Sequence, residues 1–339
     1  MPLPPLSYAQ RFEDFHLWRA LGDVQNGFYV DVGAGPPVYD NVSFAFYLAG
    51  WRGITVEPNP ALAALGRAVR PRDHLYEGLC GAAAGEATLY LQHEFHGLST
   101  TIAEHAKAAE KEINRNAEVL TLPMTTLAAL CEKQAPATFE FLKVDVEGAE
   151  ADVLRGADFS RFRPKIIVVE AIKPLTLAPA WDEWEPLLAH HGYSYVWDDE
   201  LNRYYVAEEA RAVTPRLAAG PKWYADGPQI GNFKGAAEDP SHPDHRLARL
   251  LPSADLTRLP LLDRDEILDM LTAGLPGLDR PVSAADPAML QERLFGASAA
   301  LQQMASVPPG KSIRDAYREI IDSDAFRAAT GRIAASYAW

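Results

Sequence analysis

Gly27-Phe-Tyr-Val-Asp-Val-Gly33-Ala-Gly35, followed later by Ile54-Thr-Val-Glu57-Pro58, is the stretch of sequence that decides the fold. The β-prone residues before Gly33 predict a strand, and the two glycines of the turn allow the backbone to come close to a ligand. A helical pattern over residues 42–49 then leads to a second strand that ends near Glu57. A carboxylate in this place suits the hydroxyl groups of a ribose. The stretch therefore predicts a Rossmann-type site for a nucleoside.

Two cofactors are compatible with this pattern. A dinucleotide fingerprint needs a third glycine at position 38, where this chain has Val38 behind two prolines. The cradle for a pyrophosphate is therefore poor. S-adenosylmethionine (SAM) carries an ammonium and a sulfonium and no phosphate, so Asp31 beside the glycine turn favours SAM. An NAD-linked oxidoreductase on a similar sheet stays open as an alternative.

Composition describes an ordinary globular chain. Its 339 residues are 48% hydrophobic, which is enough for one large and one small domain. Acidic residues outnumber basic ones 46 to 32, and no basic block alternates with aromatics, so we expect no nucleic-acid partner. Cys80 and Cys131 predict neither a disulfide framework nor a zinc site. Without a signal peptide or an apolar run of about 18 residues, we expect a cytoplasmic protein with no transmembrane segment.

Strands and helices alternate over residues 1–210, which predicts an α/β domain with a mostly parallel sheet. One strand is expected over residues 75–80 and one helix over residues 181–191. Residues 193–206 predict an antiparallel β-hairpin at the end of the sheet. This arrangement is typical of the Rossmann-like class I methyltransferase sheet, and not of dehydrogenases.

The residue composition changes after residue 210. Residues 211–244 are rich in proline and glycine and predict a linker or extended segment. Residues 245–339 predict a small helical C-terminal region, with capping boxes that start at Asp263 and Ser312. We expect this region to hold the contacts of a homo-oligomer or to dock a glycan-assembly enzyme.

Three carboxylates stand at successive strand ends, namely Glu57, Asp145 and Glu170. Because the ligand crevice of an open parallel sheet lies at the carboxyl ends of its strands, all three should face one cleft. Asp145 is the first candidate for a general base or for a metal ligand. Glu170 is the second residue in either case, and two carboxylates together suit Mg²⁺. Lys143 shares the strand face of Asp145, either as its ion-pair partner or as a catalytic group. His96 is a further candidate base.

Several motifs follow one another along the chain in a specific order. They are Ser7-Tyr-Ala-Gln10, Phe28-Tyr-Val-Asp-Val-Gly33, Asp40-Asn-Val-Ser43, Gly50-Trp-Arg-Gly-Ile-Thr-Val-Glu-Pro58, Gly97-Leu-Ser-Thr100, Phe141-Leu-Lys-Val-Asp-Val-Glu-Gly-Ala-Glu150, Glu183-Trp-Glu-Pro-Leu-Leu188 and Leu201-Asn-Arg-Tyr-Tyr-Val206. Together they resemble the FkbM family of SAM-dependent methyltransferases over residues 7–208. The resemblance implies O-methylation, often of a sugar hydroxyl in a glycan or a natural product.

The resemblance also implies where SAM would bind. Its methionine part would lie near Asp31, Gly33 and Gly35, its ribose on Glu57, and its adenine near Leu79 and Cys80. Because neither Leu79 nor Cys80 is acidic, recognition of the adenine amino group would fall to backbone groups. The cluster of Gln10, Glu13 and Asp14 before the first strand either folds over the cofactor or begins a helix with solvated acids.

The leading hypothesis is a SAM-dependent O-methyltransferase that acts on a small-molecule or glycan acceptor. Besides the oxidoreductase, a second alternative is a catalytically silent SAM-binding module that serves as a partner of glycan-assembly enzymes. The acceptor and the position of its hydroxyl are not defined by these patterns.

Overall fold

The computed structural model describes residues 3–176, 178–220, 224, 227–296 and 310–337. The chain divides into two compact units. The first, which we call the sheet unit, comprises Met1–Pro36, Asp40–Ala63 and Arg72–Gly227, and the second, the helical unit, comprises Pro37–Tyr39, Ala64–Pro71 and Pro228–Trp339. Residues 211–244 are thus shared between the two units.

A seven-stranded sheet forms the centre of the sheet unit, in the strand order β3-β2-β1-β7-β8-β10-β9. Neighbouring strands are parallel except at β10, which is antiparallel to both β8 and β9. The expected mostly parallel sheet with a C-terminal antiparallel hairpin is confirmed. The strands are β1 (Phe28–Val32), β2 (Arg52–Glu57), β3 (His74–Glu77), β7 (Thr138–Val144), β8 (Arg163–Glu170), β9 (Tyr193–Asp198) and β10 (Asn202–Ala207).

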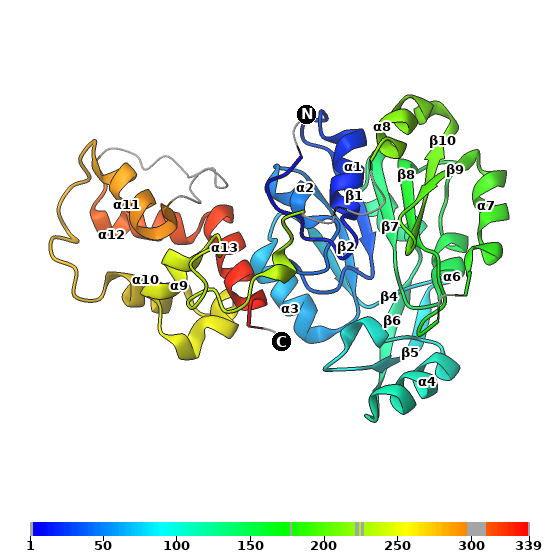
Figure 1. Ribbon diagram of the computed structural model, residues 1–339, viewed down its shortest axis with the longest axis horizontal. Helices are drawn as coiled ribbons and strands as arrows, with labels where there is room; N and C mark the ends of the chain where they lie inside the picture. Colours follow the sequence, from blue (N-terminus) through cyan, green and yellow to red (C-terminus); the bar gives the residue numbers. More distant parts are fainter. Residues whose placement is uncertain (1–2, 177, 221–223, 225–226, 297–309, 338–339) are drawn as a thin grey trace. The chain divides into compact units, whose positions relative to one another are not determined.

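Both faces of this sheet are covered by helices (Figure 1), which explains why all five residues of β1 are buried. On one face, Val30 and Val32 belong to a core shared with α5, α6 and α7. On the other face, Tyr29 belongs to a core shared with α1, α2 and α8. The helices are α1 (Glu13–Leu21), α2 (Phe44–Leu48), α3 (Pro60–Val69), α4 (Ala103–Ile113), α5 (Leu127–Gln134), α6 (Glu150–Arg155), α7 (Glu185–His190) and α8 (Thr214–Ala218).

Residues 75–80 do not form the single strand that we expected. The chain breaks at Gly78, whose φ is +152° and where a Cβ atom would lie 2.6 Å from the carbonyl oxygen of Pro123. Consequently β3 joins the large sheet, whereas β4 (Leu79–Cys80) starts a separate three-stranded sheet with β6 (Glu118–Thr125) and β5 (Gly85–Leu91). The helix expected over residues 181–191 is also divided, into a 3₁₀ turn at Trp181–Glu183 and α7.

The helical unit confirms the expected helical C-terminal region and has a core of its own. Ser312 and Asp315 form the predicted reciprocal capping box, while Asp263 caps its helix by accepting from the backbone N–H of Asp265. Inside the unit, Arg332 donates two hydrogen bonds to the buried carboxylate of Asp244, at 2.6 and 2.7 Å. The helices are α9 (His245–Leu250), α10 (Arg264–Thr272), α11 (Asp286–Phe295), α12 (Ile313–Ile321) and α13 (Asp324–Ala335).

None of the helices in the described part of the chain is long and apolar enough to cross a membrane.

Gly33 determines how closely the ends of β1 and β7 can approach. Its φ is +77°, and a Cβ atom at this position would lie 1.7 Å from the carbonyl oxygen of Asp145. Gly35 has a similar φ of +61°, but a Cβ atom there would meet nothing within 4 Å. Both glycines are conformationally required, and only Gly33 is also sterically required.

We therefore expect Gly33→Ala to destabilise the protein more than Gly35→Ala. A left-handed alanine costs about 1–2 kcal/mol at either position, and overpacking at Gly33 adds about 1–3 kcal/mol. The measurement is urea unfolding followed by tryptophan fluorescence, which reports on Trp51 and Trp184 buried in the sheet unit. Equal losses for the two variants would show that the contact with Asp145 does not constrain the fold.

Candidate functional site

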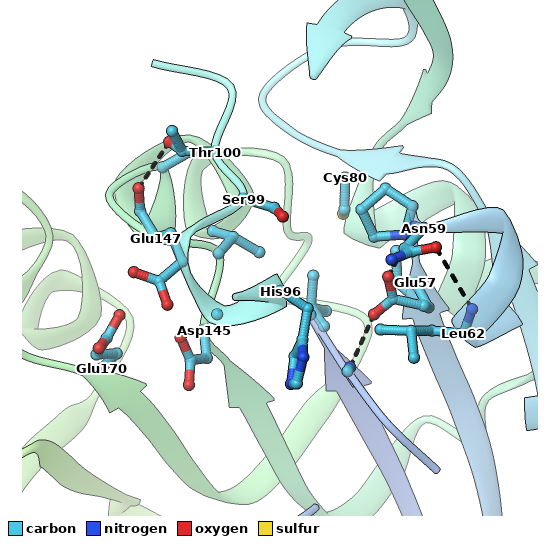
Figure 2. A pocket seen from close by; sticks show the side chains of 18 of the residues that line it. Glu57, Asn59, Leu62, Cys80, His96, Ser99, Thr100, Asp145, Glu147 and Glu170 are labelled. Carbon is cyan, nitrogen blue, oxygen red and sulfur yellow. Dashed lines mark hydrogen bonds between the residues drawn. The ribbon is translucent and has the colours of Figure 1, made fainter. Parts of the chain in front are cut away.

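A pocket of about 260 Å³ opens at the carboxyl ends of β1, β2 and β7. Its lining combines the glycine turn after β1, the end of β2, strand β4, the loop of residues 96–101, and the turn between β7 and α6. Figure 2 shows Asp145, Glu147 and Glu170 on one side and Glu57 with Asn59 on the other, with His96 between them. All of these segments belong to the sheet unit.

Glu57 is bound to the glycine turn. Its Oε2 accepts a hydrogen bond of 2.8 Å from the backbone N–H of Gly35, and its Oε1 accepts one of 2.7 Å from Asn59. Burial raises the pKa of the carboxyl group to about 7, although both hydrogen bonds act to lower it. The turn and the acid at the end of β2 thus form one preorganised unit.

Asp145 follows β7 directly and is paired with Lys143. The ammonium Nζ lies 2.7 Å from Oδ2 of Asp145, and the Lys143 side chain is almost fully buried. Burial alone would lower the pKa of Lys143, but the carboxylates of Asp145 and Asp31 outweigh it and hold the pKa above its ordinary value. Lys143 is therefore a permanent cation beside Asp145 and not a proton acceptor.

Glu147 and Glu170 stand next to Asp145. One oxygen from each of the three carboxylates lies within 4.8 Å of the others. Burial, followed by repulsion from Asp145 and other acids, raises the pKa of both Glu147 and Glu170 well above the usual range. The period of two in a strand predicts that Glu147 shares the face of Lys143 and Asp145, but Glu147 was not among the predicted site residues.

His96 opens a short 3₁₀ turn, His96–Leu98, in the loop that borders the pocket. Burial lowers its pKa, so the imidazole is neutral at pH 7 and able to accept a proton. On the same loop, the Thr100 hydroxyl donates a hydrogen bond of 2.8 Å to the carbonyl oxygen of Glu147. This bond attaches the loop to the β7–α6 turn.

The structure brings most of the predicted site residues together. The pocket lining includes Gln10, Gly33, Gly35, Glu57, Leu79, Cys80, His96, Lys143, Asp145 and Glu170. It also includes Glu13, from the cluster expected over the cofactor, and Asp40, Asn59 and Glu147, which the predicted site did not contain.

Asp31 and Asp14 are not brought to the pocket lining. Asp31 lies inside the sheet, where its Oδ2 accepts a hydrogen bond of 2.5 Å from the hydroxyl of Ser43. Asp14 is fully buried and accepts hydrogen bonds from the Ser7 hydroxyl and the backbone N–H of Tyr8. Both acids are occupied in holding the backbone that surrounds the site.

The pocket is strongly acidic. Six carboxylates contribute to its lining, whereas Lys143 is the only lysine or arginine among the lining residues that the structure describes. Such a site favours a cationic ligand, which stabilises the ionised form of acids whose pKa is raised, and among the described residues it offers a pyrophosphate no basic side chain besides Lys143. The six are Glu13, Asp40, Glu57, Asp145, Glu147 and Glu170.

The sheet order defines a Rossmann-like α/β domain, with the pocket at the carboxyl ends of its parallel strands. Residues 31–195 match the family model described as the methyltransferase FkbM domain. The predicted resemblance to the FkbM family is thereby confirmed for these residues, and the match supports a methyltransferase.

No curated protein is significantly similar to this chain in sequence. Among solved structures, a crystal structure of the O-methyltransferase from Bacillus cereus in complex with SAH is similar over 60% of this chain and 84% of that chain. The sequence identity is 12% and the TM-score is 0.32. A similarity this low carries no argument about fold or function.

The raised pKa of Glu57 predicts a pH dependence of stability. Because the folded state keeps the proton up to about pH 7, whereas the ordinary pKa is 4.5, the contribution of Glu57 is complete below pH 4.5 and is lost as the pH rises through 7. We expect the urea midpoint of the wild type to fall more steeply from pH 4.5 to 8 than that of Glu57→Gln. Parallel curves for the two proteins would contradict the raised pKa.

Proposed function

We propose that this protein is a SAM-dependent O-methyltransferase and that its acceptor is a neutral, polyhydroxylated molecule, namely a sugar or a glycan. The observation that carries the proposal is the acidic pocket at the carboxyl ends of β1, β2 and β7, with Glu57 fixed to the glycine turn. The methyltransferase match over residues 31–195 supports the same conclusion.

The residues of the pocket fit SAM better than NAD. SAM is positively charged at its sulfonium and its ammonium, and the lining offers six carboxylates to it. A pyrophosphate would need backbone donors or basic side chains, yet the N–H of Gly35 is already bonded to Glu57. In our proposal Glu57 binds the ribose, Gly33 and Gly35 admit the methionine part, and Leu79 and Cys80 border the adenine.

SAM, when bound, supplies an electrophilic methyl group: the acceptor oxygen forms a bond to the methyl carbon as the carbon–sulfur bond breaks, and the electron pair of that bond stays on sulfur. The chain must orient the acceptor hydroxyl and take its proton. Asp145 is our candidate for the proton acceptor, because it is partly exposed to the pocket and held in place by Lys143. His96, which is neutral at pH 7, is the second candidate.

The acceptor class rests on the chemistry of the lining. Among the lining residues that the structure describes, none is a phenylalanine, tyrosine or tryptophan, so a flat apolar acceptor would find no large aromatic ring to stack on. Carboxylates instead accept hydrogen bonds from hydroxyl groups, and they repel phosphorylated or acidic acceptors. Together with the FkbM match, this favours a neutral sugar.

Binding of the cofactor is tested with S-adenosylhomocysteine (SAH) and NAD. We expect SAH to raise the melting temperature and NAD to leave it unchanged. Glu57→Gln should weaken SAH binding by about 10- to 100-fold, since a hydrogen bond to a charged group contributes about 1.5–3 kcal/mol. The matched control is Glu132→Gln, an exposed acid paired with Arg161 outside the pocket. Stabilisation by NAD alone would contradict the proposal.

The proton acceptor is tested by SAH release over a panel of neutral sugars and oligosaccharides. Asp145→Asn should slow turnover by about 10²–10⁴-fold, the usual contribution of a general base, with SAH affinity unchanged. His96→Gln should have the smaller effect. If His96→Gln loses more turnover than Asp145→Asn, His96 is the proton acceptor. If Asp145→Asn turns over as fast as the wild type, the assignment to Asp145 is refuted. No turnover by the wild type on any acceptor would favour a silent SAM-binding module.

A further inference from the structure

We propose that Asp145, Glu147 and Glu170 form a binding site for one hard divalent cation of the Mg²⁺ type. One oxygen from each of these three carboxylates lies within 4.8 Å of the others, at the edge of the pocket. Figure 2 shows the three carboxylates gathered on the same side of the pocket. Carboxylate oxygens are the ligands that Mg²⁺, Mn²⁺ and Ca²⁺ prefer.

A second observation, independent of the clustering, points to a ligand at this place. The Oε2 atom of Glu170 is buried and has no hydrogen-bond partner in the described part of the chain, and the residue is only 8% exposed. An unsatisfied buried carboxylate oxygen is costly. A cation bound between the three carboxylates would supply the missing partner.

The charges of the cluster also match a divalent ion. When all three carboxyl groups are ionised around a bound cation, they and the ammonium of Lys143 carry a formal charge of −2, which one divalent cation neutralises. Lys143 bonds Oδ2 of Asp145, so that Asp145 keeps its second oxygen for a cation. Glu150 of α6 is not part of this cluster, and its Oε1 accepts hydrogen bonds from the backbone N–H groups of Val146 and Gly148.

The backbone fixes the three ligands from separate elements. Parallel pairing of Val144 with Val169 places Asp145 and Glu170 beside each other, at the ends of β7 and β8. Glu147 has a φ of +55°, and its carbonyl oxygen accepts the hydrogen bond from Thr100. The ligands are therefore held on the sheet edge before any ion arrives.

The spacing suggests which ions fit. Opposite ligands lie about 4.1 Å apart around Mg²⁺ and about 4.8 Å apart around Ca²⁺, given the usual metal–oxygen distances. Because three ligands of one ion cannot all lie opposite one another, carboxylate oxygens up to 4.8 Å apart must move closer together to bind it, and they must move less for Ca²⁺ than for Mg²⁺ or Mn²⁺. Water would complete the coordination shell.

Such a cation would lie beside Asp145, where the acceptor hydroxyl is expected. A divalent ion lowers the pKa of a hydroxyl or water that it binds, and it would also orient the acceptor. Cation binding itself does not depend on the proposed methyl transfer, so that the two proposals can fail separately.

The test uses the full-length protein with Mn²⁺ alone as the probe, since Mn²⁺ prefers the same oxygen ligands and its free form is counted by electron paramagnetic resonance. We expect one Mn²⁺ per chain, displaced by Mg²⁺ or Ca²⁺. Glu170→Gln and Glu147→Gln should each weaken binding by at least about tenfold, the effect commonly seen even for residues that only support a ligand.

The matched control is Asp152→Asn, which removes an exposed acid from α6 that is paired with Arg155. It should bind Mn²⁺ as the wild type does. Melting temperatures without metal complete the test. Replacing one of three crowded carboxyl groups with a neutral amide should leave the Glu170→Gln protein at least as stable as the wild type, while Mn²⁺ should no longer stabilise it. The proposal is overturned if the wild type binds no Mn²⁺, if Glu170→Gln binds it equally well, or if NaCl of equal ionic strength stabilises as much as Mn²⁺.

Discussion

The absence of a side chain at residue 33 is the constraint on which the site depends. Because Gly33 has no Cβ atom, the carbonyl of Asp145 can pack against the end of β1, and the backbone N–H of Asp145 bonds the carbonyl of Val32 at 3.0 Å. The same turn continues to Gly35, whose N–H is bonded to Glu57. One glycine turn thus contacts both the acid at the end of β2 and the acid directly after β7.

The site gathers buried negative charge, which is unfavourable unless the surroundings compensate for it. The protein compensates in several ways. Lys143 neutralises Asp145 and lies near Asp31, backbone N–H groups bind Glu57, and the raised pKa values of Glu147 and Glu170 favour their protonated forms. A bound cation, whether a sulfonium or a metal ion, would remove the remaining repulsion. Apolar cores on both sheet faces provide the stability that supports this arrangement.

Local patterns predicted much of the fold. Strand β1 occupies its predicted residues and β9 with β10 forms the expected hairpin, because apolar periodicity and glycine or proline boundaries are properties of short segments. The break at Gly78 was missed, since it depends on contact with Pro123 in a distant strand. Asp31 is internal because Ser43 of a later segment binds it, whereas Asp14 is held by its near neighbours Ser7 and Tyr8. The lining position of Glu147 was likewise not predicted.

The sequence by itself determined the class of the sheet, the glycine turn and the presence of acids at successive strand ends. These follow from residue type, from the period of two in strands and from the rule that parallel strands end at one edge. Only the tertiary structure decided which acids share the pocket, because side-chain direction and hydrogen-bond partners are set by packing between remote segments. In the folded protein Asp31 lies in the interior, where the hydroxyl of Ser43 binds it, and Glu147 lies beside Glu170. The carboxylates line one pocket only because the folded sheet aligns the ends of the strands that carry them.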